Sequence, residues 1–434
     1  MIPIKNLKDL GPAELGRLMN RFGEDFTAIM IDTVIPIVND VKKNGDRAVI
    51  SYTEKFDGVK PDSVMATCEE IEAGRRNTPI DLLGAFMEAK RNIEEFHRLQ
   101  VRTGIRNERE DGTVLGVMHQ PIESAAVYVP GGKASYPSSV LMGVIPAQIA
   151  GVENITLVTP PGKDGRLPAI IGAICSILDI SAVVKSGGAQ GIAAAGLGTE
   201  TVRKADLIVG PGNIYVTAAK TYLFSLGAVQ IDSLAGPSEV LVIADDRADP
   251  KWVAWDLLSQ AEHDEMAMAI LVTTSKTLAE KVRDEITADL DSGRGRHAIK
   301  KASIGRSGLI LLVDDIGAAI DFSNRFGPEH MELMVESPMD YLPKIRNVGS
   351  LFLGDYAPVA VGDYYSGTNH ILPTGGAARF SSGTSVDTFM RRTTYQLLSR
   401  AALAKARGPV EAMSRVEGFG DKHGGSLAVR FEKP

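Results

Sequence analysis

The pattern of apolar and polar positions changes near residue 114. Before that point, residues 12–55 and 78–102 carry apolar side chains at helical spacing, such as Leu83, Phe86 and Ile93, with charged residues between them. After it, short apolar runs end in Gly/Pro turns and alternate with helical segments. This alternation predicts βαβ units, in which parallel strands are joined by crossover helices.

Two such α/β stretches follow one another, and their similar texture suggests a degenerate internal duplication. The clearest unit covers residues 128–236, and a second contains the runs EVLVIAD, AMAILVTTS and LILLVDD. Residues 362–383 are rich in Gly, Ser and Thr and predict a long functional loop, and residues 386–407 are expected to form a helix.

Composition fits this picture and excludes several classes of protein. A chain of 434 residues exceeds what one core usually supports, and 44% hydrophobic with 23% charged residues is ordinary for a globular protein. The net charge of −7, without a Lys/Arg block, argues against a nucleic-acid or anionic-membrane partner. The chain shows no signal peptide and no apolar run long enough to span a bilayer, so we expect a cytoplasmic protein. Cys68 and Cys175 lie far apart and predict neither a disulfide framework nor a cysteine zinc site.

Only seven histidines are present, and two of them stand in informative surroundings. In SQAEHD, Gln260 and His263 are three residues apart on a predicted helix, where they are either a solvated surface or a pair that converges on a metal ion. In GPEHMEL, Glu329 and His330 are either two proton-transfer groups or the start of a helix, with the carboxylate at its positive end.

Three further candidates have plain explanations of their own. Asp363 in GDYYSGTNH is either an oxygen ligand or an Asx-turn residue, and Ser238 in AGPSEV suits a turn before a strand. His423, beside Lys422 in the glycine-rich tail, is by itself a solvated histidine. The histidines His97, His119 and His297 carry only surface interpretations. The chain has neither of the usual phosphate-binding glycine motifs, so a dinucleotide would bind unconventionally.

The combination of motifs is more specific than any one of them. In order, VYVPGG, GPGNIYVTAAK, AGPSEVLVIAD, LLSQAEHD, GPEHMEL, GDYYSGTNHILPTGG and ARFSSGTSV resemble the histidinol dehydrogenase family, from about residue 25 to the C-terminus. The resemblance implies an α/β fold with two incomplete Rossmann-like parallel-sheet domains and small N- and C-terminal helical or tail segments. It also implies a zinc- and NAD-dependent homodimer that oxidises L-histidinol to L-histidine.

On this basis we expect four parts in the chain. They are an N-terminal helical segment (1–24), a discontinuous first α/β domain (25–127 and 237–380), an inserted Rossmann-like domain (128–236), and a C-terminal helix and tail (381–434) that contacts the partner subunit.

The resemblance also assigns roles to individual residues. Zinc would be held by Gln260, His263, Asp363 and His423, the last from the other subunit. Glu329 and His330 would transfer protons, and NAD would contact Tyr128, Gln190 and Asn213. Substrate would contact Ser238 and Glu417 together with Gln260, His263, His330, Asp363 and His423.

One departure from the family pattern bears on the substrate. The family has a substrate-binding glutamate five residues before the tail histidine, where this chain has Gly418, and Glu417 is six before His423. We infer a one-residue insertion between Glu417 and His423. Relatives of the family oxidise other polar alcohols, such as a sulfonated propanediol. Lys422 is either a cation for such an anionic substrate or a solvated lysine, and the second is the simpler interpretation. The sequence is also compatible with a catalytically silent paralogue and with a one-step alcohol dehydrogenase.

Overall fold

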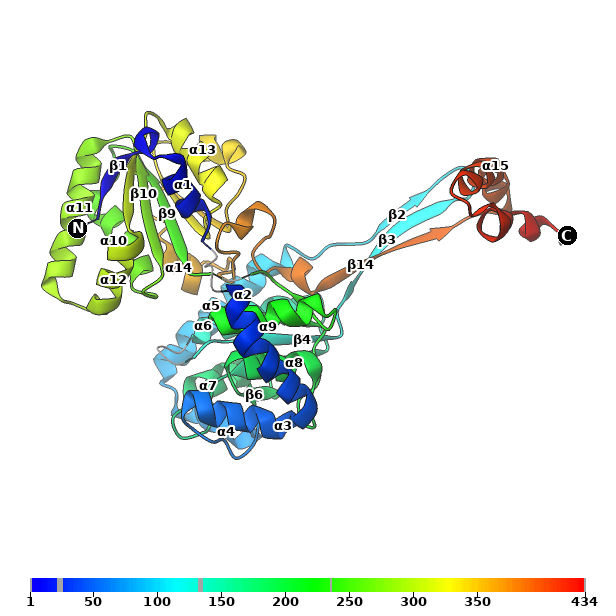
Figure 1. Cartoon of the computed structure of the whole chain (residues 1–434), viewed down its shortest axis with the longest axis horizontal. Coiled ribbons are helices and arrows are strands. Elements are labelled where there is room, and N and C mark those ends of the chain that lie inside the picture. Colours follow the sequence, from blue (N-terminus) through cyan, green and yellow to red (C-terminus); the bar gives the residue numbers. More distant parts are fainter. Residues whose placement is uncertain (1, 22–25, 132–135, 235, 433–434) are drawn as a thin grey trace. The chain divides into compact units, whose positions relative to one another are not determined.

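The computed structural model describes residues 2–21, 26–131, 136–234 and 236–432, which form two compact units. Unit 1 contains Met1–Gln100 and Ile122–Phe389, and unit 2 contains Val101–Pro121 and Met390–Pro434. The expected domain boundary at residues 24 and 25 lies outside the described residues. Unit 1 is built on two parallel sheets, here called sheet A and sheet B (Figure 1).

Sheet A has helices on both faces because its central strands are apolar on both sides. Its order is β1 (Ile4–Asn6), β11 (Leu309–Leu312), β10 (Met268–Thr273), β9 (Glu239–Ala244), β12 (His330–Met334), β13 (Ser350–Leu353). Val240 and Val242 of β9 pack toward α10 (Pro250–Ala261), α11 (Lys276–Ser292) and α12 (His297–Ser307). Leu241 and Ile243 pack toward α1 (Pro12–Met19) and α13 (Ile316–Phe326).

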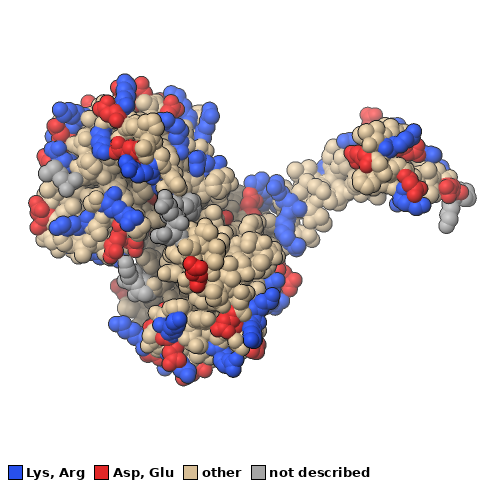
Figure 2. Space-filling model, viewed as in Figure 1, with Lys and Arg blue, Asp and Glu red and all other residues tan. Residues whose placement is uncertain are grey.

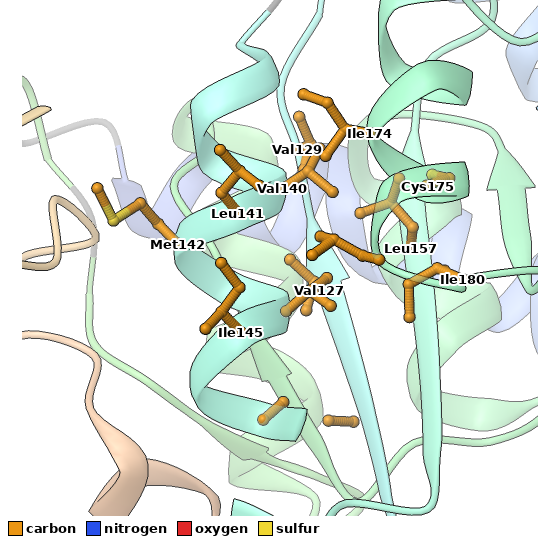
Figure 3. Close-up of a cluster of buried hydrophobic side chains, with 14 of the residues drawn as sticks. Val127, Val129, Val140, Leu141, Met142, Ile145, Leu157, Ile174, Cys175 and Ile180 are labelled. Carbon is orange, nitrogen blue, oxygen red and sulfur yellow. The ribbon is translucent and has the colours of Figure 1, made fainter. Parts of the chain in front are cut away.

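Sheet B follows the same principle. Its order is β6 (Val183–Lys185), β5 (Asn154–Thr159), β4 (Ser124–Tyr128), β7 (Leu207–Val209), β8 (Gln230–Ile231). One face packs on α5 (Ile80–Arg98), α6 (Pro137–Ala150) and α7 (Ala169–Ile177), and α4 (Cys68–Asn77) packs beside α7. Figure 3 shows this core, where Val127 of β4 lies between Ile145 of α6 and Leu157 of β5. The other face packs on α3 (Ile35–Asp57), α8 (Gly188–Leu197) and α9 (Ile214–Ser225).

The two sheets share one topology. In chain order, the five strands β9–β13 of sheet A and the five strands β4–β8 of sheet B both lie in the spatial order third, second, first, fourth, fifth. β1 is an additional edge strand of sheet A. This arrangement confirms the predicted pair of incomplete Rossmann-like parallel-sheet domains and agrees with an internal duplication.

The N-terminal helical pattern is divided into several pieces. α1 is preceded by a 3-10 turn (Leu7–Asp9), and a second helical run consists of α2 (Phe26–Ile29), a π-helical turn (Met30–Val34) and α3. Within α3, Gly45 has φ of 54° and kinks the helix. The predicted helix over 78–102 is observed as α5.

Unit 2 contains a three-stranded antiparallel sheet and a helical tail. The strand order is β14 (Met390–Leu397), β3 (Val114–Pro121), β2 (Ile105–Glu108). The tail contains α15 (Arg400–Val416), a π-helical turn (Gly420–Gly424) and a 3-10 turn (Ala428–Phe431).

The prediction of one helix over 386–407 is therefore wrong. Residues 386–389 form a 3-10 turn, 390–397 form β14, and only the part from Arg400 onward belongs to an α-helix. The reason is tertiary: the Thr393-Thr394-Tyr395 segment favours a strand, and all eight residues of β14 pair with β3 from far away in the chain.

The loop after β13 is mostly irregular, as predicted, but begins with a short helix. This helix is α14 (Val359–Tyr364), and a 3-10 turn occurs at Ala377–Arg379; another 3-10 turn, Pro338–Lys344, lies before β13. None of the described helices is long and apolar enough to cross a membrane. Figure 2 shows Lys/Arg and Asp/Glu side chains interspersed over the visible face of unit 1.

Candidate active site

The amino edge of sheet A holds a buried carboxylate and imidazole side by side. Glu329 and His330 stand at the start of β12, next to the start of β9, so they do not open a helix. The backbone N–H of Glu239 donates to Oε2 of Glu329 at 2.9 Å, and Nδ1 of His330 lies 3.0 Å from the carbonyl oxygen of Glu239. One residue of β9 thus contacts both side chains.

These contacts determine the tautomer of His330. A carbonyl oxygen only accepts hydrogen bonds, so Nδ1 carries the proton and Nε2 carries the free lone pair. Nε2 is buried without a hydrogen-bond partner among the described residues and lies 3.9 Å from Oδ1 of Asp363. Burial lowers the pKa of His330 to about 3, so the ring is neutral at pH 7. His330 is therefore oriented to accept a proton at Nε2.

The pKa of Glu329 is shifted in the direction opposite to that of His330. Burial raises the pKa of Glu329 well above its usual value, and the nearby Glu239 and Asp363 carboxylates add to the rise. The hydrogen bond from Glu239 N–H partly offsets this effect. A carboxyl group in such surroundings binds a proton readily, which suits a group that takes protons from water or substrate.

Three of the four predicted zinc ligands lie in unit 1, at the ends of short helical segments. Gln260 is in the last turn of α10, His263 is the second residue after that helix, and Asp363 is in α14 rather than in an irregular loop. A positive charge on His263 opposes protonation of His330 and of His370, so these imidazoles lie within electrostatic range of one another. His370 contacts Asp363 through Nδ1, which lies 2.9 Å from the Asp363 carbonyl oxygen.

The donor set has the properties of residues that hold a cation. Asp363 is buried, and burial raises its pKa to about 7 because its charge lacks compensation. Gln260 is 3% exposed, and its Nε2 has no hydrogen-bond partner among the described residues. Since the oxygen and nitrogen of an amide are interchangeable in such an assignment, Gln260 can present its oxygen to an ion. The residues therefore fit a zinc ion held by oxygen and nitrogen.

Across the described residues, no three His, Cys, Asp or Glu side chains form a ready metal cluster. This is compatible with the predicted ligand set. Of its three members in unit 1, His263 and Asp363 are of those residue types, and the third is the amide Gln260.

The three predicted NAD contacts gather at the carboxyl edge of sheet B. Tyr128 ends β4, Gln190 is in the first turn of α8, and Asn213 caps α9 after β7. The Tyr128 hydroxyl accepts a hydrogen bond from the N–H of Gly188 at 3.2 Å, and burial raises its pKa to about 12. Oε1 of Gln190 is buried and has no partner among the described residues. This edge lies between β4 and β7, where the strand order reverses and nucleotides bind in such sheets.

The GPGN turn is held tightly against β4. Gly210 has φ of 115°, and a Cβ atom there would lie 2.1 Å from the carbonyl oxygen of Tyr128. Asp232 accepts from the N–H of Gly210 at 2.7 Å, and the buried Lys220 ammonium bonds both Asp232 and the Gly210 carbonyl. The turn therefore has a fixed shape before any ligand binds.

The other predicted residues are more exposed. Ser238 is half-buried and directly precedes Glu239, whereas Glu417 and His423 are exposed in unit 2. Lys422 is exposed and lies 3.6 Å from Asp421, as expected of a solvated lysine.

The sequence interpretation missed two residues, Glu239 and Arg21, that lie near the Glu329–His330 pair. Glu239 carried a detectable signal, since it is a charged residue opening the apolar strand EVLVIA. Arg21 carried none, because an arginine after a surface helix is ordinary. Its guanidinium is buried, with Nε 2.6 Å from Oε1 of Glu239.

Two Rossmann-like sheets with a buried carboxyl group and imidazole at one edge are the framework of an α/β enzyme. Residues 20–431 match the family model described as histidinol dehydrogenase. Similar proteins include the histidinol dehydrogenases of Leptospira interrogans (47% identity, covering 96% of each chain) and Clostridium acetobutylicum (45% identity, covering 96% of this chain and 95% of the relative). A crystal structure of histidinol dehydrogenase from Elizabethkingia anophelis matches with a TM-score of 0.92 and 38% identity, covering 99% of this chain and 98% of that one.

The class of protein is thus an NAD-dependent oxidoreductase. Within that class, the chain belongs to the histidinol dehydrogenase family.

Proposed function

We propose that this protein oxidises L-histidinol to L-histidine in histidine biosynthesis, in two successive NAD-dependent steps that pass through a bound aldehyde. The observation that carries the proposal is the Glu329–His330 pair, buried and held by one residue of β9 in a chain of this family. The reaction converts one alcohol, one water and two NAD⁺ into one carboxylate, two NADH and three protons.

His330 is proposed to accept the hydroxyl proton of the alcohol. Its Nε2 has the free lone pair, while the Nδ1–H bond to the Glu239 carbonyl keeps the ring in one orientation and one tautomer. As the proton leaves, the carbinol carbon loses a hydride and the aldehyde forms.

Glu329 is proposed to activate the water that adds to the aldehyde. Its carboxylate accepts a proton from water, the hydroxyl bonds to the carbonyl carbon, and the resulting hydrate loses the second hydride to become the acid. Oε2 of Glu329 is 3.6 Å from Nδ1 of His330, which supports action of the two groups on one substrate. Retention of the aldehyde between the steps protects it from side reactions.

We propose that zinc is held by Gln260, His263 and Asp363 of one subunit and His423 of its partner. When bound, the ion would orient the polar groups of the substrate and supply Lewis-acid assistance. Ser238 and Glu417 are proposed as further substrate contacts, besides the ligands and His330.

For NAD, we propose the carboxyl edge of sheet B with Tyr128, Gln190 and Asn213. The unpartnered Oε1 of Gln190 and the rigid GPGN turn support this choice. When bound there, NAD would supply the hydride acceptor for both oxidations. NAD use and the two unpaired cysteines agree with a cytoplasmic place of action.

We further propose that the enzyme is a homodimer in which unit 2 contacts the partner subunit. All residues of β2 and seven of the eight in β14 are exposed, including the apolar Ile105, Tyr395 and Leu397. An exposed sheet with apolar side chains is a typical contact surface, and a second copy of the chain is the partner that the family implies.

The test is to incubate the zinc-loaded protein with NAD and either L-histidinol or dihydroxypropanesulfonate, and to count NADH per alcohol consumed. We expect two NADH per L-histidinol and no turnover of the sulfonate. Turnover of the sulfonate alone would refute the histidine-biosynthesis assignment, and one NADH per alcohol would indicate a one-step dehydrogenase. Absence of NADH with either alcohol, together with absence of bound zinc, would indicate a silent paralogue.

A further inference from the structure

The acid–base pair is held by the main chain of Glu239 and not by its side chain. The Glu239 N–H donates to Glu329, and the Glu239 carbonyl accepts from His330. The orientation of both side chains therefore depends on where the first residue of β9 lies. A small shift of this strand start would move the two proton acceptors together.

The position of the start of β9 is held by the side chain of Glu239, which contacts Arg21 and Gly375. Its Oε1 lies 2.6 Å from Nε of Arg21 and accepts a hydrogen bond from the N–H of Gly375 at 3.2 Å. The Glu239 and Arg21 side chains are 1% and 4% exposed, so their ion pair is shielded from water. Removing one partner would leave the other charge buried and uncompensated.

Arg21 also contacts the turn that leads from α13 to Glu329 and His330. Its Nη2 donates to the carbonyl oxygens of Phe326 at 2.9 Å and Gly327 at 3.4 Å, and its guanidinium lies 3.7 Å from the centre of the Phe326 ring. Phe326 ends α13, and Glu329 and His330 follow three and four residues later. One planar cation thus joins the strand that orients the pair to the turn that carries it.

We propose that Arg21, acting through Glu239, is the positioning residue of the Glu329–His330 pair. It does not touch the reacting atoms. It keeps the start of β9 and the end of α13 at one separation, so that the carboxylate and the imidazole point into the site together. This inference rests on the proposed function only for its kinetic test, because the geometry that it describes is independent of the substrate.

The kinetic test is a double-mutant cycle between Arg21→Met and Glu329→Gln in the zinc-loaded enzyme, with L-histidinol as substrate. We expect Arg21→Met to lower kcat about tenfold to hundredfold, since small misplacements of catalytic groups have effects of that size. KM for both substrates should change less than about threefold, because binding groups are untouched. In the Glu329→Gln background, Arg21→Met should lower kcat further by less than about threefold. Equal factors in both backgrounds would show that Arg21 acts independently of the pair.

A spectroscopic test does not require turnover. With ¹⁵N-labelled histidine, the Nδ1–H of His330 should give a slowly exchanging proton signal that disappears in His330→Gln. We expect this signal to shift or lose its protection in Arg21→Met. An unchanged signal would overturn the proposal even if the protein oxidises another alcohol or none.

Two further variants control for loss of folding and for charge. Arg325→Met removes an exposed arginine one residue before Phe326 and should leave kcat within about twofold. Arg21→Lys keeps a positive charge near Glu239 but lacks the planar fork that reaches the two carbonyls, so its kcat should fall between those of the wild type and Arg21→Met. Wild-type kcat in Arg21→Lys would refute the role of the fork.

Discussion

Adjacent residues in this chain differ in protonation because each meets a different set of neighbours. Burial disfavours charge on both Glu329 and His330, raising the pKa of the acid and lowering that of the base. Glu239 separates their roles, since it donates to the carboxylate and accepts from the ring. The result is a neutral imidazole with one free nitrogen beside a carboxyl group that binds protons strongly.

Substitution of each residue should therefore affect a different half-reaction. Glu329→Gln should lower the rate from alcohol to acid about a hundredfold or more, because a general base for water is lost. It should leave reduction of added histidinal by NADH within about threefold of wild type, whereas His330→Gln should impair that reduction strongly. Both variants should retain zinc, measured by elemental analysis, since neither residue is a proposed ligand. Equal loss of aldehyde reduction in both variants would contradict this division.

At the scale of secondary-structure elements, the proposed chemistry lies at opposite edges of the two sheets. The Glu329–His330 pair is at the amino edge of sheet A, and the proposed cofactor residues are at the carboxyl edge of sheet B. The edge of sheet B depends on a close backbone contact between the end of β4 and Gly210, secured by the buried Lys220–Asp232 pair.

A side chain at Gly210 should break this contact. Gly210→Ala would place a Cβ against the Tyr128 carbonyl at a φ that is unfavourable for alanine. We expect the free energy of unfolding, measured in urea, to fall by about 2–4 kcal/mol, and KM for NAD to rise. Gly305→Ala in α12 is the matched control, because its Cβ would meet nothing within 4 Å. It should be neutral or stabilising by up to about 1 kcal/mol. A similar stability for the two variants would show that the Gly210 contact is unimportant.

At the scale of the whole molecule, the proposed ligands are divided between the two units. Gln260, His263 and Asp363 belong to unit 1, and His423 belongs to unit 2. In a dimer whose tails are exchanged, each zinc site would need one unit from each subunit.

Mixed dimers test this arrangement. Glu329→Gln and His423→Ala should each be nearly inactive as homodimers. After the two are unfolded and refolded together, half of the dimers are mixed, and one site of each mixed dimer combines an intact unit 1 with an intact tail. Recovery of about a quarter of wild-type activity is expected for such an isologous dimer. If His423 completes the site of its own subunit, no activity will return.

The sequence predicted most of the fold because its signals are local. Apolar runs such as AAVYV and EVLVIAD bounded by turns correspond to β4 and β9, and the amphipathic pattern after residue 78 corresponds to α5. It failed where a distant partner decides the conformation. The segment after Phe389 forms β14 rather than a helix because β3, from a far earlier part of the chain, pairs with it.

By itself, the sequence determined the class of fold, the family and the residue types available for chemistry. It left two interpretations open for each motif, since spacing along a chain does not specify which side chains are in contact. Only the tertiary structure decided that Glu329 and His330 open a strand, that Asp363 stands in a helix and that Arg21 and Glu239 lie behind the pair. The physical reason is that hydrogen bonds and burial act between groups close in space, and these come from distant parts of the chain.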